Sequence, residues 1–301
     1  MNAPHEIEVV VRGLPLAVLQ WHVPHDDRTA VVLLHGYLEQ ALAWQDVAVR
    51  LGRNTIAPDH RGHGRSGHVG RGGFYHLWDY VADLDRVIDT LRGGHPVDLV
   101  GHSMGGTVAS LYAANRPDRV RRLVLVEGLG PQTDARGMIA ARAQTFLDNC
   151  QDPPRHRALA DLDDAVRRLR KANPSIPQAV AQRLAARITR PVRDDDPHVD
   201  TPSVAGSLVW TWDPLHRARS PWPFDGATFQ DHLGRIKAPT RLVYGANSPY
   251  PAWLGDLAQR EGALPRHDRV VIPDAGHLLH IEQPEAVAEA ILGHLDAEIT
   301  E

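Results

Sequence analysis

A serine flanked by glycines ends an apolar segment in the stretch LVGHSMGG, residues 99–106. Gly101 and Gly105 leave room for a sharp strand-to-helix turn, which forces Ser103 into a strained conformation and exposes its hydroxyl. In such a turn the backbone N–H of Met104 faces the position where a substrate carbonyl oxygen gains negative charge. The pattern predicts Ser103 as a nucleophile and Met104 as an oxyanion donor. A glycine-rich turn with an incidental serine is the alternative.

A histidine follows the last apolar segment, in the stretch IPDAGHLLHIEQP at residues 272–284. His277 would lie over the carboxyl edge of a sheet, within reach of Ser103. An imidazole is suited to take and return a proton there, because its pKa lies near neutrality. His280 is the nearest rival, but its place at the start of a helix favours a surface or packing role.

A second loop contributes to the same edge through the stretch LLHGYLEQ, residues 33–40. Alone it would be an ordinary loop between a strand and a helix. Paired with the serine turn, it predicts that the backbone N–H of Tyr37 completes an oxyanion hole with that of Met104.

Eight apolar segments rich in β-forming residues recur along the chain, and several are followed by helical patterns. Strands that alternate with helices imply a mostly parallel sheet with helices on both faces, which is an α/β fold. The segments are 6–11, 15–21, 29–36, 54–59, 97–103, 121–128, 240–245 and 268–277.

The alternation stops between the sixth and seventh segments, where Arg, Asp and Pro are frequent. Helical patterns at 161–170 and 177–188 interrupt this stretch, and we interpret it as an insertion. We therefore predict a core formed by residues 1–130 and 231–301, with a helical cap over 131–230.

Aromatic residues cluster late in the cap, in the stretch GSLVWTWDPLHRARSPWPF, residues 206–224. Trp210 and Trp212 would share one face of an extended segment. Together with His216, and with His102 beside the nucleophile, they are predicted to contact substrate. Packing that seats the cap is an equally good explanation for the aromatic side chains.

The chain resembles the α/β-hydrolase superfamily, and more closely its serine hydrolase-like members with a helical cap. The resemblance covers nearly the whole chain except the insertion. The stretches that show it are LLHGY, APDHRGHGRSG, LVGHSMGG, LVLVEGLG, RIKAPTRLVYG and IPDAGHLLHIEQPEAV. It implies Ser103 as nucleophile, His277 as base and the amides of Tyr37 and Met104 as oxyanion donors, with the insertion as a lid.

The acid that orients the histidine does not occupy its commonest family position. That position, after the seventh strand, holds Ser248, whose neutral hydroxyl cannot stabilise an imidazolium as a carboxylate does. Glu127 follows the sixth strand, where some family members, including certain haloalkane dehalogenases, carry the acid. We predict Glu127 as the acid. Asp256, in an expected helix, and Asp274, close to the histidine along the chain, are weaker candidates.

Composition limits the other classes of function. The 301 residues are 43% hydrophobic and 23% charged with a formal charge of −4, so no basic field is present to attract nucleic acid. The single cysteine, Cys150, cannot form an internal disulfide. The N-terminal segment lacks the features of a signal peptide, and no apolar stretch reaches the roughly 18 residues of a membrane span. A cytoplasmic location is expected.

Cofactor and metal signatures are weak. The glycines at 62, 64 and 67 have dinucleotide-binding spacing, but no helix opens directly after them and no acid ends a strand about 20 residues later. No paired-cysteine or HExxH spacing accompanies the nearby loop histidines, which are His60, His63, His68 and His76. We therefore expect no cofactor and no metal.

The pattern as a whole predicts a serine hydrolase that cleaves a small to medium, apolar carboxylic ester through a Ser-His-Glu triad and an acyl-enzyme. A thioester, a lactone or a carbon–carbon bond is an alternative target, because one triad supports many reactions. A non-hydrolytic or ligand-binding protein of the same fold is a further alternative. A small-molecule substrate is expected, and the oligomeric state is left open.

Overall fold

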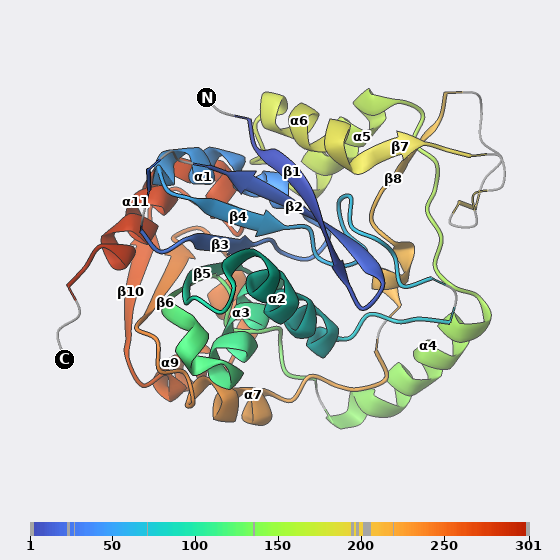
Figure 1. Ribbon diagram of the computed structural model, residues 1–301. Coiled ribbons are helices and arrows are strands. Elements are labelled where there is room, and N and C mark those ends of the chain that lie inside the picture. The colour runs from blue at the N-terminus through green and yellow to red at the C-terminus, as the bar shows by residue number, and fades with distance from the viewer. Residues whose placement is uncertain are drawn as a thin grey trace.

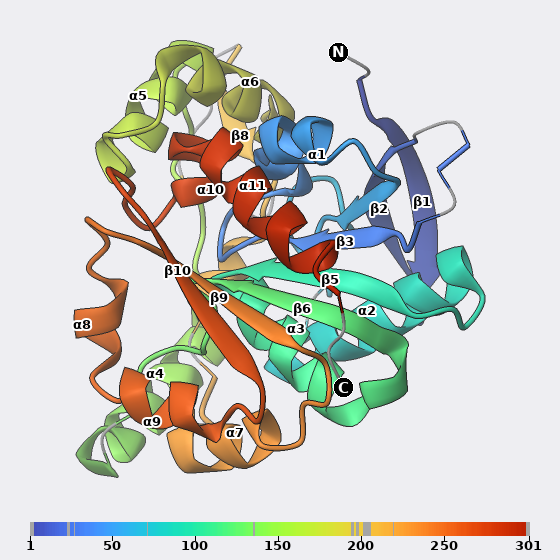
Figure 2. The ribbon, with the colours of Figure 1, turned by 90° about the vertical axis from the view of Figure 1, so that its left-hand side faces the viewer.

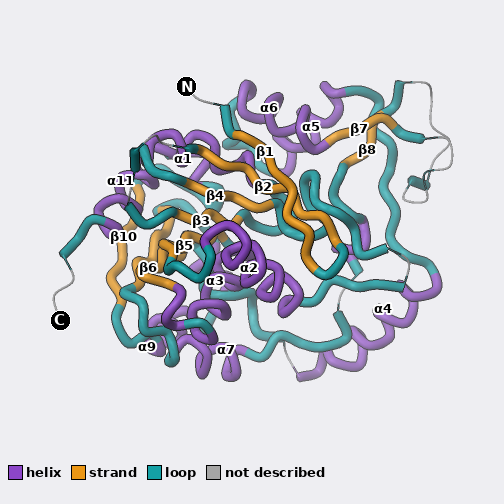
Figure 3. The backbone as a smooth tube through the Cα atoms, viewed as in Figure 1, coloured by secondary structure: helices purple, strands orange, loops and turns teal. Residues whose placement is uncertain are grey.

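A mixed sheet of eight strands forms the centre of the molecule (Figure 1 and Figure 3). This computed structural model describes residues 3–22, 25–26, 28–70, 72–134, 136–193, 196, 199–200, 206–218 and 220–298. The strands, in their order across the sheet, are β1 (His5–Val11), β2 (Leu14–Trp21), β4 (Thr55–Pro58), β3 (Val31–Leu34), β5 (Val97–His102), β6 (Val120–Val126), β9 (Thr240–Gly245) and β10 (His267–Ile272). β2 runs antiparallel to β1 and β4, and the other neighbouring strands are parallel. The prediction of a mostly parallel sheet is confirmed.

Helices cover both faces of the sheet. α1 (Gln45–Leu51), α10 (Leu279–Glu282) and α11 (Pro284–Leu295) lie on the face that Figure 2 shows in front of the strands. α2 (Leu77–Arg92), α3 (Met104–Asn115) and α7 (Gly226–Leu233) cover the other face. The segments α8 (Tyr250–Leu254) and α9 (Leu257–Ala263) lie between β9 and β10 in the chain. None of the helices in the described residues has the length and apolar character needed to cross a membrane.

The central strands are buried on both faces, which explains their nearly continuous apolar sequences. Successive side chains of a strand point to opposite faces. In β5, Leu99 packs into the core beneath α2 and α3, whereas Val100 packs into the core beneath α1 and α11. In β6, Leu123 likewise packs into the core beneath α2 and α3, and Val124 packs into the core beneath α1 and α11.

A third hydrophobic cluster lies in the region predicted as the cap. Helices α5 (Leu162–Ala172) and α6 (Gln178–Ile188) pack on each other, and their cluster also includes Leu278 and Ile281 from the region of β10 and α10. A two-stranded sheet, β7 (Thr189–Pro191) and β8 (Leu208–Trp210), follows α6. The remaining elements are α4 (Ile139–Gln151) and the 3₁₀ segments 41–44, 117–119, 136–138 and 214–217. The cap boundaries at 131 and 230 stay a prediction.

A buried ion pair joins α6 to the loop after β4. Arg187 donates to both carboxylate oxygens of Asp59, at 2.6 and 3.1 Å, and Asp59 is fully buried. Because an isolated buried charge is costly, this pair fixes the position of α6 relative to the sheet.

Candidate active site

Ser103 occupies a strained turn between β5 and α3. Its φ of +50° and ψ of −115° fall outside the regions that residues with a side chain usually adopt. The flanking glycines are required by close packing: a Cβ on Gly101 would lie 2.4 Å from the Gly105 oxygen, and one on Gly105 would lie 2.4 Å from the Leu34 oxygen. This geometry matches the turn predicted from the sequence.

His277 lies in the loop between β10 and α10. Its Nε2 is 3.2 Å from the hydroxyl oxygen of Ser103. The Tyr250 ring stacks on the imidazole with 5.7 Å between ring centroids. The imidazole is 36% exposed, so a proton acceptor stands beside the serine in a position that a substrate can approach.

Glu127 completes a continuous chain of hydrogen bonds. The residue directly follows β6 with a φ of +47°, and its side chain is fully buried. Its Oε2 lies 2.5 Å from Nδ1 of His277. A carboxylate only accepts hydrogen bonds, so Nδ1 carries the proton and Nε2 is free to accept one from Ser103. The structure therefore brings the three predicted residues together.

Ser248 also contacts this carboxylate. Its hydroxyl donates to Oε2 of Glu127 at 2.6 Å, while the Gly245 N–H donates to Oε1 at 3.0 Å.

The other two candidates for the triad acid, Asp256 and Asp274, do not contact His277 among the described residues. Asp256 precedes α9 and pairs with Arg260 at 2.9 Å. Asp274 is exposed on the loop after β10.

Tyr37 and Met104 line the same cavity as Ser103. Met104 is the first residue of α3, so its amide belongs to the positive end of the helix. The loop that carries Tyr37 is held by Gly36, whose N–H donates to Oε2 of Glu39 at 2.6 Å. The hydroxyl of Tyr37 donates to the carbonyl of His216 at 2.7 Å, which connects this loop to the predicted cap.

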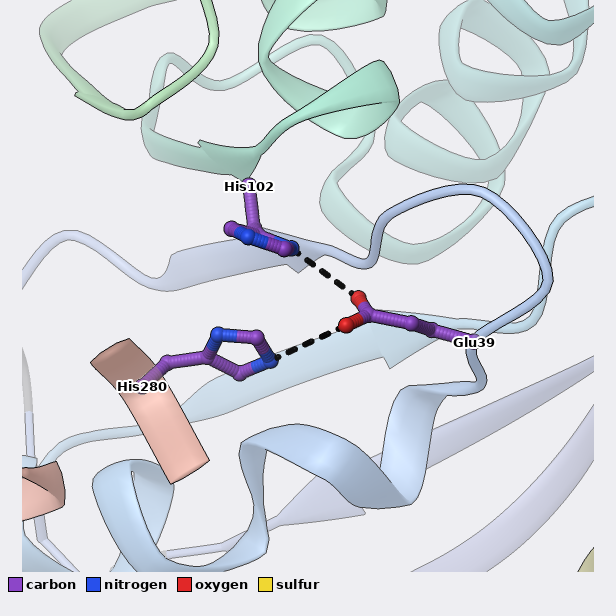
Figure 4. Close-up of side chains that lie close together, drawn as sticks. All are labelled: Glu39, His102 and His280. Atoms are coloured by element: carbon purple, nitrogen blue, oxygen red, sulfur yellow. Dashed lines mark hydrogen bonds and ion pairs between the residues drawn. The ribbon is translucent and has the colours of Figure 1, made fainter. Parts of the chain in front are cut away.

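His102, which precedes Ser103 in the chain, belongs to a largely buried group with Glu39 and His280 that was not predicted from the sequence (Figure 4). His102 Nδ1 is 3.0 Å from Glu39 Oε2, and its Nε2 is 2.8 Å from the carbonyl oxygen of His277. Both partners are acceptors, so both nitrogens of His102 donate and the ring is an imidazolium. Burial, the largest single effect, lowers the pKa of His102, but the Glu39 carboxylate, the His277 carbonyl and the Glu127 carboxylate together raise it, and the net shift is upward. His280 completes this group, with its ring centroid 4.3 Å from that of His102.

The surroundings of two histidines bear on the roles expected for them: His102 lines the cavity, and His280 has the packing role that was one of its two expected roles. His102 is almost fully buried, and both of its ring nitrogens bond within the protein. His280, expected to lie on the surface or in packing, is fully buried and packs on Trp44. The sequence signal for the group was a carboxylate three residues after the loop glycine at 36, to which no role was assigned.

A cavity of about 870 Å³ opens above Ser103 and His277. The predicted cap contributes much of its wall, and the aromatic residues Trp210 and Trp212 lie in its lining. Other apolar lining residues come from α5, α6 and the region after β9, among them Leu169, Leu184, Ile188 and Trp253.

His216 lies away from this cavity lining. Its ring stacks on Tyr75 with 3.8 Å between ring centroids, and its Nε2 is 3.1 Å from the carbonyl oxygen of Gly62. The glycine-rich loop therefore contacts the segment predicted as the cap. Gly64 has a φ of +53°, and a Cβ there would lie 2.3 Å from the carboxyl carbon of Asp59, so this glycine serves a tight turn.

Comparison with known proteins places these features in a family context. The sequence matches the family described as alpha/beta hydrolase fold over residues 29–284. It is 31% identical over 278 residues to a serine hydrolase-like protein of Danio rerio, covering 88% of this chain and 81% of that protein. It is 26% identical over 300 residues to an esterase of Mycobacterium tuberculosis, covering 98% and 91%. Among solved structures, the thioesterase domain from the curacin biosynthetic pathway superposes with a TM-score of 0.82 at 34% identity, covering 97% of this chain and 100% of that one.

Proposed function

This chain belongs to the α/β-hydrolase family, and from that premise we propose that it is a serine hydrolase that cleaves carboxylic esters with an apolar acyl group. One observation supports the proposal above the others. Hydrogen-bond distances run without a break from Ser103 to His277, at 3.2 Å, and from His277 to Glu127, at 2.5 Å.

In the proposed first step, the Ser103 oxygen attacks the ester carbonyl carbon while its proton passes to Nε2 of His277. The Glu127 carboxylate holds the imidazole in the correct tautomer and stabilises the imidazolium. The carbonyl oxygen becomes an oxyanion and accepts hydrogen bonds from the amides of Tyr37 and Met104. His277 then gives the proton to the leaving alcohol, and an acyl-enzyme is left.

In the second step, water attacks the acyl-enzyme and His277 again acts as the base. The second tetrahedral intermediate collapses, the proton returns to the Ser103 oxygen, and the carboxylic acid is released. All proton transfers in this scheme pass through one imidazole, which fits its half-exposed position above the serine.

The cavity supports an apolar acyl group. A volume of about 870 Å³ is large enough for a medium-sized ligand. Leu184, Ile188 and Trp210 contribute apolar surface from the segment 131–230, which we propose acts as a lid over the site.

Hydrolysis of p-nitrophenyl esters with increasing acyl length tests this function. The parent protein is expected to hydrolyse them and Ser103→Ala to be inactive. Labelling with a fluorophosphonate, followed by peptide mass spectrometry, is expected to modify Ser103. A folded parent protein that neither turns over these esters nor reacts with the fluorophosphonate would support a ligand-binding protein instead.

A thioester is the second candidate substrate. The thioesterase domain described above shares 34% identity over nearly all of this chain, which favours this possibility. Matched pairs of N-acetylcysteamine thioesters and oxygen esters with the same acyl group separate the two candidates. A kcat/KM that is higher for the thioester at every acyl length would favour thioester hydrolysis.

A further inference from the structure

Glu39, His102 and His280 form a compact group in which both histidines are buried and Glu39 is partly buried (Figure 4). One potential ligand atom from each residue lies within 4.8 Å of the others. Glu39 comes from the loop after β3, His102 from the end of β5 and His280 from α10. Three separate elements therefore direct nitrogen and oxygen atoms to one point.

Three polar atoms in this group lack hydrogen-bond partners among the described residues. His280 is fully buried, yet neither of its ring nitrogens makes a hydrogen bond there. Oε1 of Glu39 is also buried without a hydrogen bond, and it lies 3.7 Å from Nε2 of His280. Leaving such groups unpaired costs free energy, so this arrangement indicates that a further species binds between them.

We propose that this group is a binding site for a divalent transition metal ion of the Zn²⁺ type, held by Glu39 Oε1, His102 Nδ1 and His280 Nε2. Two imidazole nitrogens and one carboxylate oxygen suit Zn²⁺ better than Mg²⁺ or Ca²⁺, which prefer oxygen ligands. Tetrahedral Zn²⁺ bonds of about 2.0–2.2 Å place neighbouring ligand atoms roughly 3.3–3.6 Å apart. The 3.7 Å gap between Glu39 Oε1 and His280 Nε2 nearly matches this distance, and the ligand atoms, which lie within 4.8 Å of one another, contract around the ion.

The surroundings of His102 fit the role of a ligand. A metal-bound histidine usually donates its other ring N–H to a carbonyl or carboxylate, which orients the ring. Nε2 of His102 has such a partner in the carbonyl of His277, at 2.8 Å. The proton on Nδ1 of His102 is released when the ion binds, because the metal takes the lone pair of that nitrogen. Water then fills the fourth coordination position of the ion.

An ion can reach this site from the substrate cavity, because Glu39 and His102 both contribute to the cavity lining. The same two residues hold the serine site in place. Glu39 accepts the N–H of Gly36 in the predicted oxyanion loop, and His102 contacts the backbone of His277. Contraction around an ion would shift both contacts, so a bound ion is expected to inhibit hydrolysis. This consequence rests on the proposed function, whereas ion binding does not.

Equilibrium dialysis of the untagged full chain against Zn²⁺ measures binding directly, and ester hydrolysis in the same buffers measures inhibition. His280→Phe keeps a ring against Trp44 but removes the ligand nitrogen. His95→Gln removes an exposed histidine that precedes β5, at the opposite end of that strand from His102, and serves as the matched control. The parent and His95→Gln are expected to bind one equivalent of Zn²⁺ and to be inhibited by it. His280→Phe is expected to bind at least about tenfold more weakly and to resist inhibition.

Zinc binding and inhibition that persist unchanged in folded His280→Phe would overturn the proposal, since the ion would then bind elsewhere, such as at His277. Absence of binding by the parent would also overturn it, and the unpaired atoms would then be assigned to water. Zinc-edge anomalous diffraction from soaked parent crystals locates the ion without any variant. If Zn²⁺ binds but the parent hydrolyses no ester, the metal site stands and the proposed function fails.

Discussion

Ser248 donates a 2.6 Å hydrogen bond to Oε2 of Glu127, although Ser248 occupies the position after β9 where the family most often places the acid. The same carboxylate oxygen lies 2.5 Å from Nδ1 of His277. The residues after β6 and β9 therefore meet at one carboxylate oxygen. Glu127, after β6, supplies the negative charge, and Ser248, after β9, donates a hydrogen bond that stabilises this charge. We therefore expect that the two positions can exchange roles, with the acid at position 248, without moving the histidine.

Glu127→Gln is expected to lower kcat for ester hydrolysis by about 10⁴, because an amide cannot stabilise the imidazolium and can enforce the wrong tautomer. Ser248→Ala is the matched control. It removes one hydrogen bond but keeps the charge, and the Gly245 N–H still holds the carboxylate, so a loss of about tenfold or less is expected. Steady-state kinetics on one p-nitrophenyl ester compares them. Near-parent activity of Glu127→Gln would show that another group orients the histidine.

Moving the acid tests the exchange of roles. Residue 127 has a φ of +47°, which glycine adopts readily, so Glu127→Gly removes the carboxylate without straining the backbone. Adding Ser248→Asp supplies a carboxylate from the end of β9 instead. The kcat of the double variant is expected to be at least about tenfold higher than that of Glu127→Gly, since a triad acid acts mainly by stabilising the charge of the imidazolium and fixing its tautomer. The idea fails if the double variant folds but recovers nothing. Ser248→Asp alone is expected to lower the melting temperature, because two carboxylates would then meet in one buried place.

The fold and the positions of the candidate triad residues were predictable because each depends on a local sequence pattern. Each strand of the main sheet lies within or overlaps one of the apolar segments, and the strained turn around Ser103 needs only its neighbouring glycines. Glu127 was predictable because an acid directly after a buried strand has few structural explanations. The role of Ser248 was not predictable, since its partner lies 121 residues away in the sequence.

The buried Glu39 group was missed for a similar reason. Glu39 and His102 are 63 residues apart in the sequence, and neither belongs to a spacing that suggests metal ligands. His216 was expected near the substrate because aromatic residues surround it in the sequence. In the structure His216 packs against Gly62 and Tyr75 instead, and contacts of this kind depend on the tertiary fold.

Arg187→Met is expected to lower the free energy of unfolding by about 3–5 kcal/mol, because it leaves the Asp59 carboxylate buried without its cation. Urea unfolding at neutral pH measures the change. Arg167→Met is the matched control, since Arg167 lies on α5 with its side chain 66% exposed and pairs with Asp164 at 3.3 Å. This variant is expected to change the free energy by no more than about 1 kcal/mol. Equal effects of the two substitutions would argue against a special role for the buried pair.

Acid is expected to destabilise the protein through its buried histidines. Burial lowers the pKa of His60 to about 4 and the pKa values of His63 and His280 to about 3, from an ordinary value of 6.5. Between those folded values and 6.5, the unfolded chain binds protons that the folded chain does not. Stability therefore falls as the pH decreases below 6.5, by up to about 1.4 kcal/mol per pH unit for each such histidine.

Urea unfolding in metal-free buffer at several pH values between 7 and 5 measures this dependence. His280→Phe is expected to reduce the slope of unfolding free energy against pH, because one histidine no longer contributes. His95→Gln, at an exposed position, is expected to leave the slope unchanged. An identical slope in the parent and His280→Phe would show that His280 does not titrate differently in the folded and unfolded chains.

The cavity wall formed by the predicted cap is expected to set the preferred acyl length. Ile188→Trp fills part of the cavity, so kcat/KM for the longest p-nitrophenyl ester that the parent accepts should fall by about tenfold or more, while the acetyl ester is nearly unaffected. Trp210→Ala removes wall surface and is expected to shift the optimum toward longer chains. Trp222→Ala is the control, because Trp222 is 76% exposed and lies outside the cavity lining. If all three variants keep the parent's length profile, the acyl group does not bind beneath the cap, and the apolar cavity has another role.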